Sequence, residues 1–234
     1  MSKTKKAVII GSVLVGIGVI IGFIGIAIGG FKFPNGAVDL TTMKALHTEK
    51  KTVQIADAFD KIEIAGASSM DIEICKSKTG KNYVEYYDTD DWTSHVDVKD
   101  HVLKFTTDDK GKHKAIVSLG FGKDTAARLY LADAEYKEIA VTTLSGYVTI
   151  QDVNAGTVNV SASSGDIDLE SCDAEKFDIT TSSGDVDMEI TAGRTYRFET
   201  KTNSGAVDVP DGDADSDYLC KIVTSSGDVD VKQK

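Results

Sequence analysis

The sequence is poor in the residues that define several protein classes. Its 234 residues include only 2 prolines, which excludes a collagen-like chain and a proline-rich disordered chain. The 4 histidines are scattered without metal-ligand spacing. The 3 cysteines are an odd number, so they cannot all pair within the chain. This composition and length leave one or two domains.

Basic side chains are also scarce relative to acidic ones. The chain has 26 lysines and arginines against 37 aspartates and glutamates, for a net charge of −11. Residues 133–234 hold 8 basic and 21 acidic side chains, so the C-terminal part is the acidic one. Such a chain would repel phosphates, and we therefore expect no nucleic-acid partner.

One long apolar segment follows a cluster of three lysines in the first six residues. As a helix, residues 7–29 would be about 35 Å long, which is enough to cross a hydrocarbon layer of about 30 Å. This segment is too long for the apolar part of a cleaved signal peptide, and no convincing cleavage site precedes Lys32. The sequence therefore predicts a cytoplasmic tail (1–6), one transmembrane helix (7–29) and an extracellular remainder, anchored in the cell membrane.

Four glycines of this segment, Gly18, Gly22, Gly25 and Gly29, would share one helix face. Small residues at such spacing allow two helices to approach closely, which favours self-association. The alternative is that glycine is simply common in membrane helices.

Residues 30–52 show no sustained periodicity and are predicted to be a juxtamembrane linker. From Val53 onward, apolar and polar residues alternate with the period of two that is typical of strands. We expect residues 53–132 to form an N-terminal β part of the outside domain, and hardly any segment favours a helix.

Residues 133–234 contain five copies of one phrase, of which 225–231 (Ser-Ser-Gly-Asp-Val-Asp-Val) is typical. The copies are centred on glycines that are 19, 19, 21 and 22 residues apart, namely Gly146, Gly165, Gly184, Gly205 and Gly227. A degenerate copy occupies residues 68–74. Units of this size cannot bury a core alone, so the repeats are predicted to stack.

The apolar positions change parity at each glycine, which predicts a bulge or corner there with a positive φ. Both strands of a repeat then direct their apolar side chains at one interior. The predicted fold class is all-β: a parallel β-solenoid preceded by one transmembrane helix. An antiparallel meander is the competing arrangement.

These repeats, together with the phrase at 59–64 (Phe-Asp-Lys-Ile-Glu-Ile), resemble the bacterial putative-adhesin domain family. That family is a cell-envelope domain of unknown function. The resemblance implies a β-solenoid on a bacterial surface, with some relatives linked to envelope-stress responses, and it carries over no catalytic residue.

Aspartates recur after the glycines and would share one outward face. In-register stacking would set like charges about 4.8 Å apart. Two interpretations are open: a solvated face that prevents aggregation, or a surface that binds a cation or a basic partner. The predicted face consists of Asp166, Asp168, Asp185, Asp187, Asp208, Asp228 and Asp230.

A second acidic group, Asp211, Asp213, Asp215 and Asp217, alternates along one loop. Carboxylates at such intervals suit Ca²⁺, although the loop lacks the glycine and glutamate of an EF-hand and an unliganded turn is the alternative. No other cofactor is expected. Among the cysteines, Cys220 falls at an inward position, whereas Cys75 and Cys172 could pair only if the first and middle repeats meet.

The sequence therefore predicts a membrane-anchored bacterial surface protein with a non-enzymatic interaction domain, adhesin-like or involved in envelope-stress sensing. Its partner would be an envelope protein or a wall polymer. The alternatives are an enzyme that acts on wall polysaccharide and a structural spacer.

The predicted topology can be tested with protease on intact cells. We expect protease to remove the outside domain and to leave a small membrane-bound fragment that contains the N-terminal lysines. Recovery of a soluble mature protein that starts near Lys32 would contradict the uncleaved anchor.

Overall fold

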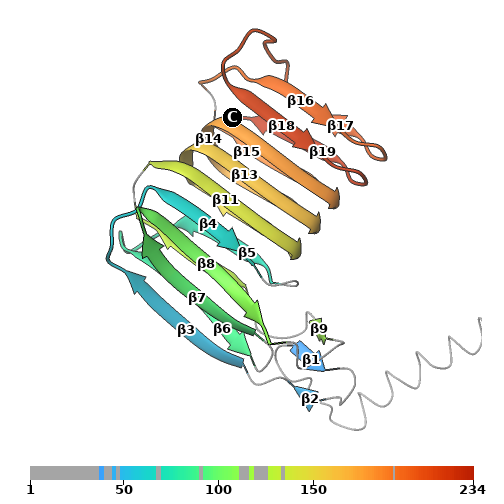
Figure 1. The fold of residues 1–234 in the computed structure, drawn as a ribbon. Helices are drawn as coiled ribbons and strands as arrows, with labels where there is room; N and C mark the ends of the chain where they lie inside the picture. The colour runs from blue at the N-terminus through green and yellow to red at the C-terminus, as the bar shows by residue number, and fades with distance from the viewer. Residues whose placement is uncertain are drawn as a thin grey trace, which may run out of the picture. The chain divides into compact units, whose positions relative to one another are not determined.

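The computed structural model describes residues 37–39, 44–45, 48–66, 70–89, 92–110, 116–118, 126–132, 135–191 and 193–234. The predicted tail, the predicted transmembrane helix and its four glycines lie outside these ranges. Within them, no helix is long and apolar enough to span a membrane. All regular secondary structure that is described is β, so the predicted all-β class is confirmed (Figure 1).

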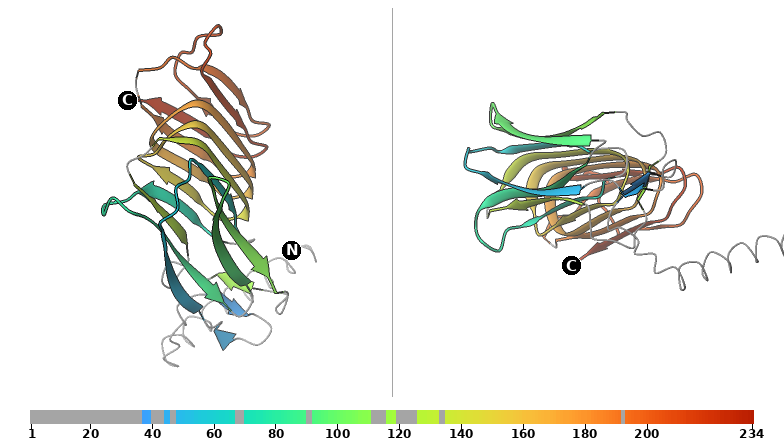
Figure 2. Two further views of the ribbon diagram at one scale, coloured as in Figure 1. Left: turned by 60° about the vertical axis from the view of Figure 1, so that its left-hand side comes forward. Right: turned by 90° about the horizontal axis from the view of Figure 1, so that it is seen from below.

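Sixteen strands form one mixed sheet, which folds over at strand β14 (Ile167–Ser183) so that two arms face each other (Figure 2). The first arm contains, in spatial order, β3 (Thr48–Ile55), β6 (Asn82–Thr89), β10 (Ala127–Leu131), β5 (Ile72–Lys76), β12 (Val148–Gln151), the first part of β14, β15 (Val186–Ile190), β19 (Val229–Gln233) and β17 (Val207–Asp208). The second arm contains β7 (Trp92–Lys99), β8 (Val102–Asp109), β4 (Lys61–Ala65), β11 (Tyr136–Ser145), β13 (Asn154–Ser164), the second part of β14, β18 (Leu219–Val223) and β16 (Arg197–Lys201). A separate small sheet contains β2 (Lys44–Ala45), β1 (Ala37–Asp39) and β9 (Ile116–Ser118).

Each repeat contributes one strand to the second arm and, after its glycine, one strand to the first arm. Equivalent strands pair in parallel and in register, so that Ile139 faces Val158 and Val158 faces Phe177 across neighbouring strands. The other end of the sheet departs from the predicted parallel arrangement, because β3, β6 and β10 are joined by antiparallel pairs and β7 pairs antiparallel with β8. These strands lie outside the repeats, whose phrase therefore could not specify their direction.

The last two repeats are exchanged in spatial order. β18 pairs with both β14 and β16, and β19 pairs with both β15 and β17. The C-terminal repeat, β18–β19, is thus inserted between its predecessors, and β16–β17 forms the outermost layer (Figure 1).

The predicted corner with a positive φ is confirmed at four of the five repeat glycines, Gly165, Gly184, Gly205 and Gly227, whereas Gly146 does not have a positive φ. Gly165 and Gly227 have φ of 146° and 153°. A Cβ atom on Gly184 would lie 2.1 Å from the carbonyl oxygen of Gly165, so the corner backbones are in direct contact. The threonines that precede the corners pack against them: the hydroxyls of Thr181 and Thr224 are buried and donate to glycine carbonyls at 3.4 Å.

The inner faces of the two arms share one hydrophobic core. Phe177 and the predicted inward residue Cys220 are fully buried in it, and so is Cys172. Burial raises the pKa of both thiols to about 12, so they stay protonated and unreactive. Cys75 is only half-buried on β5, and all three cysteines are free thiols.

One predicted boundary needs correction. Strand β3 begins at Thr48, inside the predicted linker 30–52, which also contains β1 and β2. The start of this strand was not predicted because lysines stand where apolar residues would indicate a strand. In the structure these lysines form ion pairs with β6, as in the pair between Lys50 and Glu85 at 3.0 Å. The predicted parts 53–132 and 133–234 of the outside domain share one sheet, since β10 and β12 both pair with β5.

Substitution of a corner glycine tests the backbone contact. We expect Gly184→Ala to cost at least roughly 2 kcal/mol more than Gly193→Ala, because the new methyl group would displace the stacked carbonyl. Gly193 is a matched control: its φ is also positive, at 123°, but its Cβ would meet no atom within 4 Å. Equal costs in denaturant unfolding would show that the corner tolerates a side chain.

Candidate functional site

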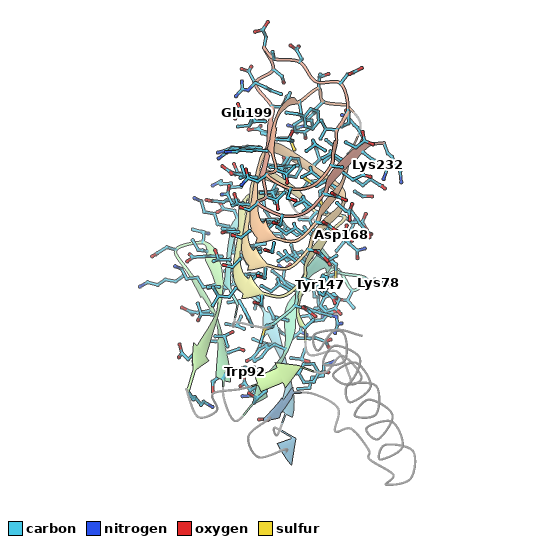
Figure 3. All side chains as sticks on the ribbon, turned by 90° about the vertical axis from the view of Figure 1, so that its right-hand side faces the viewer. Lys78, Trp92, Tyr147, Asp168, Glu199 and Lys232 are labelled. Atoms are coloured by element: carbon cyan, nitrogen blue, oxygen red, sulfur yellow. The ribbon has the colours of Figure 1, made fainter. Side chains whose placement is uncertain are left out.

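Four of the predicted face residues form one row on the outer face of the first arm. Asp168 lies opposite Asp187, Asp187 opposite Asp230, and Asp230 opposite Asp208. We call these four residues the acidic ladder. Figure 3 shows Asp168 and Lys232 projecting from the same side of the stacked strands, with Glu199 on the opposite side.

Two neighbouring members of the ladder, Asp168 at one end and Asp187 beside it, are electrostatically strained. Burial raises the pKa of Asp168, and the charges of Glu170 and Asp187 raise it further. Desolvation likewise raises the pKa of Asp187, with a further contribution from Asp230. Within the part of the chain that the structure describes, neither carboxylate has an ion pair.

The next member of the ladder, Asp230, is partly neutralised. The ammonium group of Lys232 lies 3.0 Å from the carboxylate of Asp230, which raises the pKa of Lys232. This pair is exposed, so water and salt screen it and it contributes little to stability. Asp168 and Asp187 therefore carry partly desolvated charges that no ion pair compensates, whereas Asp208 at the far end of the ladder is exposed to solvent.

The other three predicted face residues have a structural role at the corners. The carboxylate of Asp166 accepts a hydrogen bond from the backbone N–H of Asp185 at 2.9 Å, and that of Asp185 accepts one from Asp228 at 2.8 Å. The carboxylate of Asp228 accepts one from Ala206 at 2.7 Å. Each thus satisfies a backbone donor in the neighbouring repeat, so the seven aspartates form two rows with different roles.

Two exposed apolar residues at one corner were missed by the sequence reasoning. Leu144 and Tyr147 are 57% and 59% exposed and flank Gly146. The corresponding positions in the next repeat hold Ser163 and Asp166. This departure from the repeated phrase is the signal that could have identified them. Large exposed side chains such as these are typical contact residues in protein interfaces.

The predicted calcium loop forms a turn held by its own hydrogen bonds. The carboxylate of Asp213 accepts a hydrogen bond from the backbone N–H of Asp215 at 2.9 Å. Across the described ranges, no three His, Cys, Asp or Glu side chains are grouped so that they could hold one metal ion. The structure therefore does not bring Asp211, Asp213, Asp215 and Asp217 together around one point.

The aromatic side chains between Tyr83 and Trp92 pack within the sheet. Tyr83 stacks on Tyr130 with ring centroids 4.4 Å apart, and Tyr86 is buried against Phe105. The indole N–H of Trp92 donates to the carbonyl of Tyr87 at 3.2 Å. These contacts favour a packing role over an open ligand platform.

Comparison with known proteins identifies a family and a fold. The profile of the family described as Toastrack DUF4097 matches residues 59–234. A crystal structure of a putative cell adhesion protein from Clostridium sporogenes has a TM-score of 0.62 at 18% identity and covers 81% of this chain and 100% of its own. A putative adhesin from Bacteroides fragilis has a TM-score of 0.42 at 17% identity, with 82% and 98% covered. No curated protein matches the chain.

The raised pKa values of the ladder predict a specific pH dependence of stability. An aspartate whose pKa is higher in the folded state binds more protons there, so its contribution to stability is lost as the pH rises through that folded pKa. We expect Asp168→Asn/Asp187→Asn to gain stability relative to the parent as the pH rises from about 4 to about 7. The gain should be roughly 0.2–1 kcal/mol per like-charge pair relieved.

The measurement is denaturant unfolding at several pH values and at low salt, where charge repulsion is least screened. Asp211→Asn/Asp213→Asn makes the same change of charge away from the ladder and serves as the control. A stability difference that does not change with pH would contradict repulsion within the ladder.

Proposed function

The chain belongs to the Toastrack DUF4097 family, and on that premise we propose that it is an adhesin-like, non-enzymatic interaction domain whose acidic ladder binds a cationic surface. The observation that carries this proposal is the in-register row Asp168, Asp187, Asp230 and Asp208. Four like charges in one row cost stability, and a basic partner would offset that cost.

The geometry of the face supports binding rather than catalysis. The ladder lies on the outside of a sheet, where an extended partner can contact all four carboxylates at once. Tyr147 and Leu144 add exposed apolar area near the same arm. A partner that combines basic and apolar groups, as an envelope protein does, suits this combination.

The second candidate, an enzyme that acts on wall polysaccharide, receives less support from the arginines. Such an enzyme needs a basic catalytic side chain beside the acidic face. Arg194 instead pairs with Asp173 at 2.9 Å, and Arg197 pairs with Glu199 on the second arm at 3.2 Å. The third candidate, a structural spacer, remains an outcome of the test below.

We further propose that the domain is held at the cell membrane by the N-terminal apolar segment, with the N-terminus cytoplasmic and the repeats outside the cell. Self-association through Gly18, Gly22, Gly25 and Gly29 and a role in envelope-stress sensing belong to the same proposal. Its support is the sequence pattern, together with a fold shared with a protein named as a putative cell adhesion protein. The parallel, in-register pairing of equivalent strands supports the description of the repeats as a β-solenoid.

The ladder proposal is tested by charge removal in the full chain, reconstituted in lipid nanodiscs. One variant replaces Asp168, Asp187, Asp208 and Asp230 with Asn. Its matched control replaces Asp211, Asp213, Asp215 and Asp217 with Asn, which makes the same change in net charge away from the ladder. Binding to isolated bacterial cell walls and to polylysine-coated beads is measured at low and high salt.

We expect the ladder variant to stay folded and to lose about tenfold or more in binding, while the control binds as the parent does. Parent binding should weaken at high salt, since the contacts are ionic. Equal losses of binding in the two variants would show that net charge alone, and not the ladder, determines binding. Unchanged binding by the ladder variant would show that the ladder is only a solvated surface, and it would favour the structural spacer.

A further inference from the structure

A half-open pocket of about 370 Å³ lies at the edge of the molecule opposite the glycine corners, where the first arm turns into the second. Its floor is apolar and is built from Leu131, Tyr136, Val153 and Ala155, all of which are buried. Its volume falls within the range of small-molecule binding sites. The acidic ladder contributes no residue to it.

The pocket exists because the chain leaves the repeats after β5 and returns to them at β11. At the exit, the backbone N–H of Ser77 donates to the carbonyl of Leu131 at 2.6 Å. At the return, the backbone N–H of Ala132 donates to the side-chain carbonyl of Asn82 at 2.7 Å. These two hydrogen bonds hold both sides of the pocket in place, so the pocket is formed before any ligand binds.

The rim of the pocket is polar and bears both signs of charge. It is formed by Lys76, Glu135, Asp152, Asn154, Asp173 and Arg194. Among the described residues of the rim, three carboxylates thus face two cations, and the chain as a whole carries a charge of −11. Both facts disfavour an anionic ligand.

One side of the rim is rigid. Nε of Arg194 lies 2.9 Å from the carboxylate of Asp173, and the guanidinium group stacks over the ring of Tyr218 at 4.6 Å. The hydroxyl of Tyr196 donates to the carbonyl of Ala174 at 2.7 Å and lies 3.4 Å from the carboxylate of Asp173. This arrangement positions a carboxylate and a guanidinium group at the pocket mouth.

The other side offers unused hydrogen-bonding groups. Asp152 lies on the turn between β12 and β13, Asn154 is the first residue of β13, and both are exposed. Within the described part of the chain, the side chains of Asp152, Asn154 and Glu135 have no hydrogen-bond partner. They therefore present carboxylate and amide groups that are free to bind hydroxyl or amine donors.

We propose that this pocket binds a short oligosaccharide that is neutral or carries amino groups. A sugar ring has an apolar C–H face, which fits the floor, and hydroxyl groups around its edge, which fit the rim. The surplus of carboxylates on the rim accommodates an amine and repels an acidic sugar. The inference does not depend on the acidic ladder, which lies elsewhere on the first arm.

The test uses the full chain in lipid nanodiscs and titration calorimetry with three probes. These are oligomers of N-acetylglucosamine (neutral), of glucosamine (amine-bearing) and of galacturonic acid (anionic). We expect saturable binding of the neutral or the amine-bearing oligomer and none of the anionic one. Absence of saturable binding for both of the first two probes would overturn the proposal.

The key variant is Asp152→Gly/Asn154→Ala. Glycine removes the carboxylate and tolerates the positive φ of 53° at this position, so the backbone is not strained. We expect binding to weaken about tenfold or more, because bound hydroxyls would lose their acceptors. Unchanged affinity in this folded variant would contradict the assignment.

A second variant protects the test if the first fails to fold. Glu135→Gln changes one exposed side chain, and it should weaken binding of the amine-bearing oligomer more than that of the neutral one. An unchanged ratio of the two affinities would contradict a role for the rim charge. The ladder variant described above is the control, and it should bind oligosaccharide as the parent does. Failure of the pocket proposal can therefore be distinguished from failure of the ladder proposal.

Discussion

The structure depends on the close contact of backbones at the glycine corners. A Cβ atom on Gly227 would lie 2.0 Å from the carbonyl oxygen of Gly184, and one on Gly165 would lie 2.2 Å from that of Gly146. Only glycine allows this approach. Because neighbouring repeats can make it at one register alone, the corner aligns every pair of equivalent residues along both arms. A slip of one residue would turn the apolar side chains out of the core.

The same register decides what the aspartates do. At the corner it places Asp166 and Asp185 beside the free N–H groups of the next repeat, where their carboxylates accept hydrogen bonds. Two residues further on, it places Asp168 opposite Asp187, where neither finds a donor; desolvation raises the pKa of both carboxylates, and neighbouring acidic side chains raise it further. One row of aspartates therefore stabilises the stack and the other is strained by it, so function is better sought in the second row.

How much could be predicted follows from what the repeats encode. The change in parity of the apolar positions at each glycine predicts the corner, the shared core and the ladder, and all three were predicted from the sequence. The order of the last two repeats was not, because Val207 and Val229 belong to the same phrase and either could pair with Val186. The pocket was not predicted for another reason: its rim is formed by Lys76, Glu135, Asp152 and Arg194, which lie far apart in the sequence and share no motif.

The exchanged order of the last repeats has a physical consequence for the exposed edge. The inserted repeat is well buried, with Val229 only 1% exposed, whereas Val207 in the outermost repeat is 42% exposed. The outermost strand of the first arm, β17, has only two residues, and β16 at the edge of the second arm bears Arg197, Glu199 and Lys201. Short and charged edge strands discourage pairing with other chains. The repeat that is least able to extend the sheet therefore lies at its end, which disfavours edge-to-edge pairing with another chain at this end of the molecule.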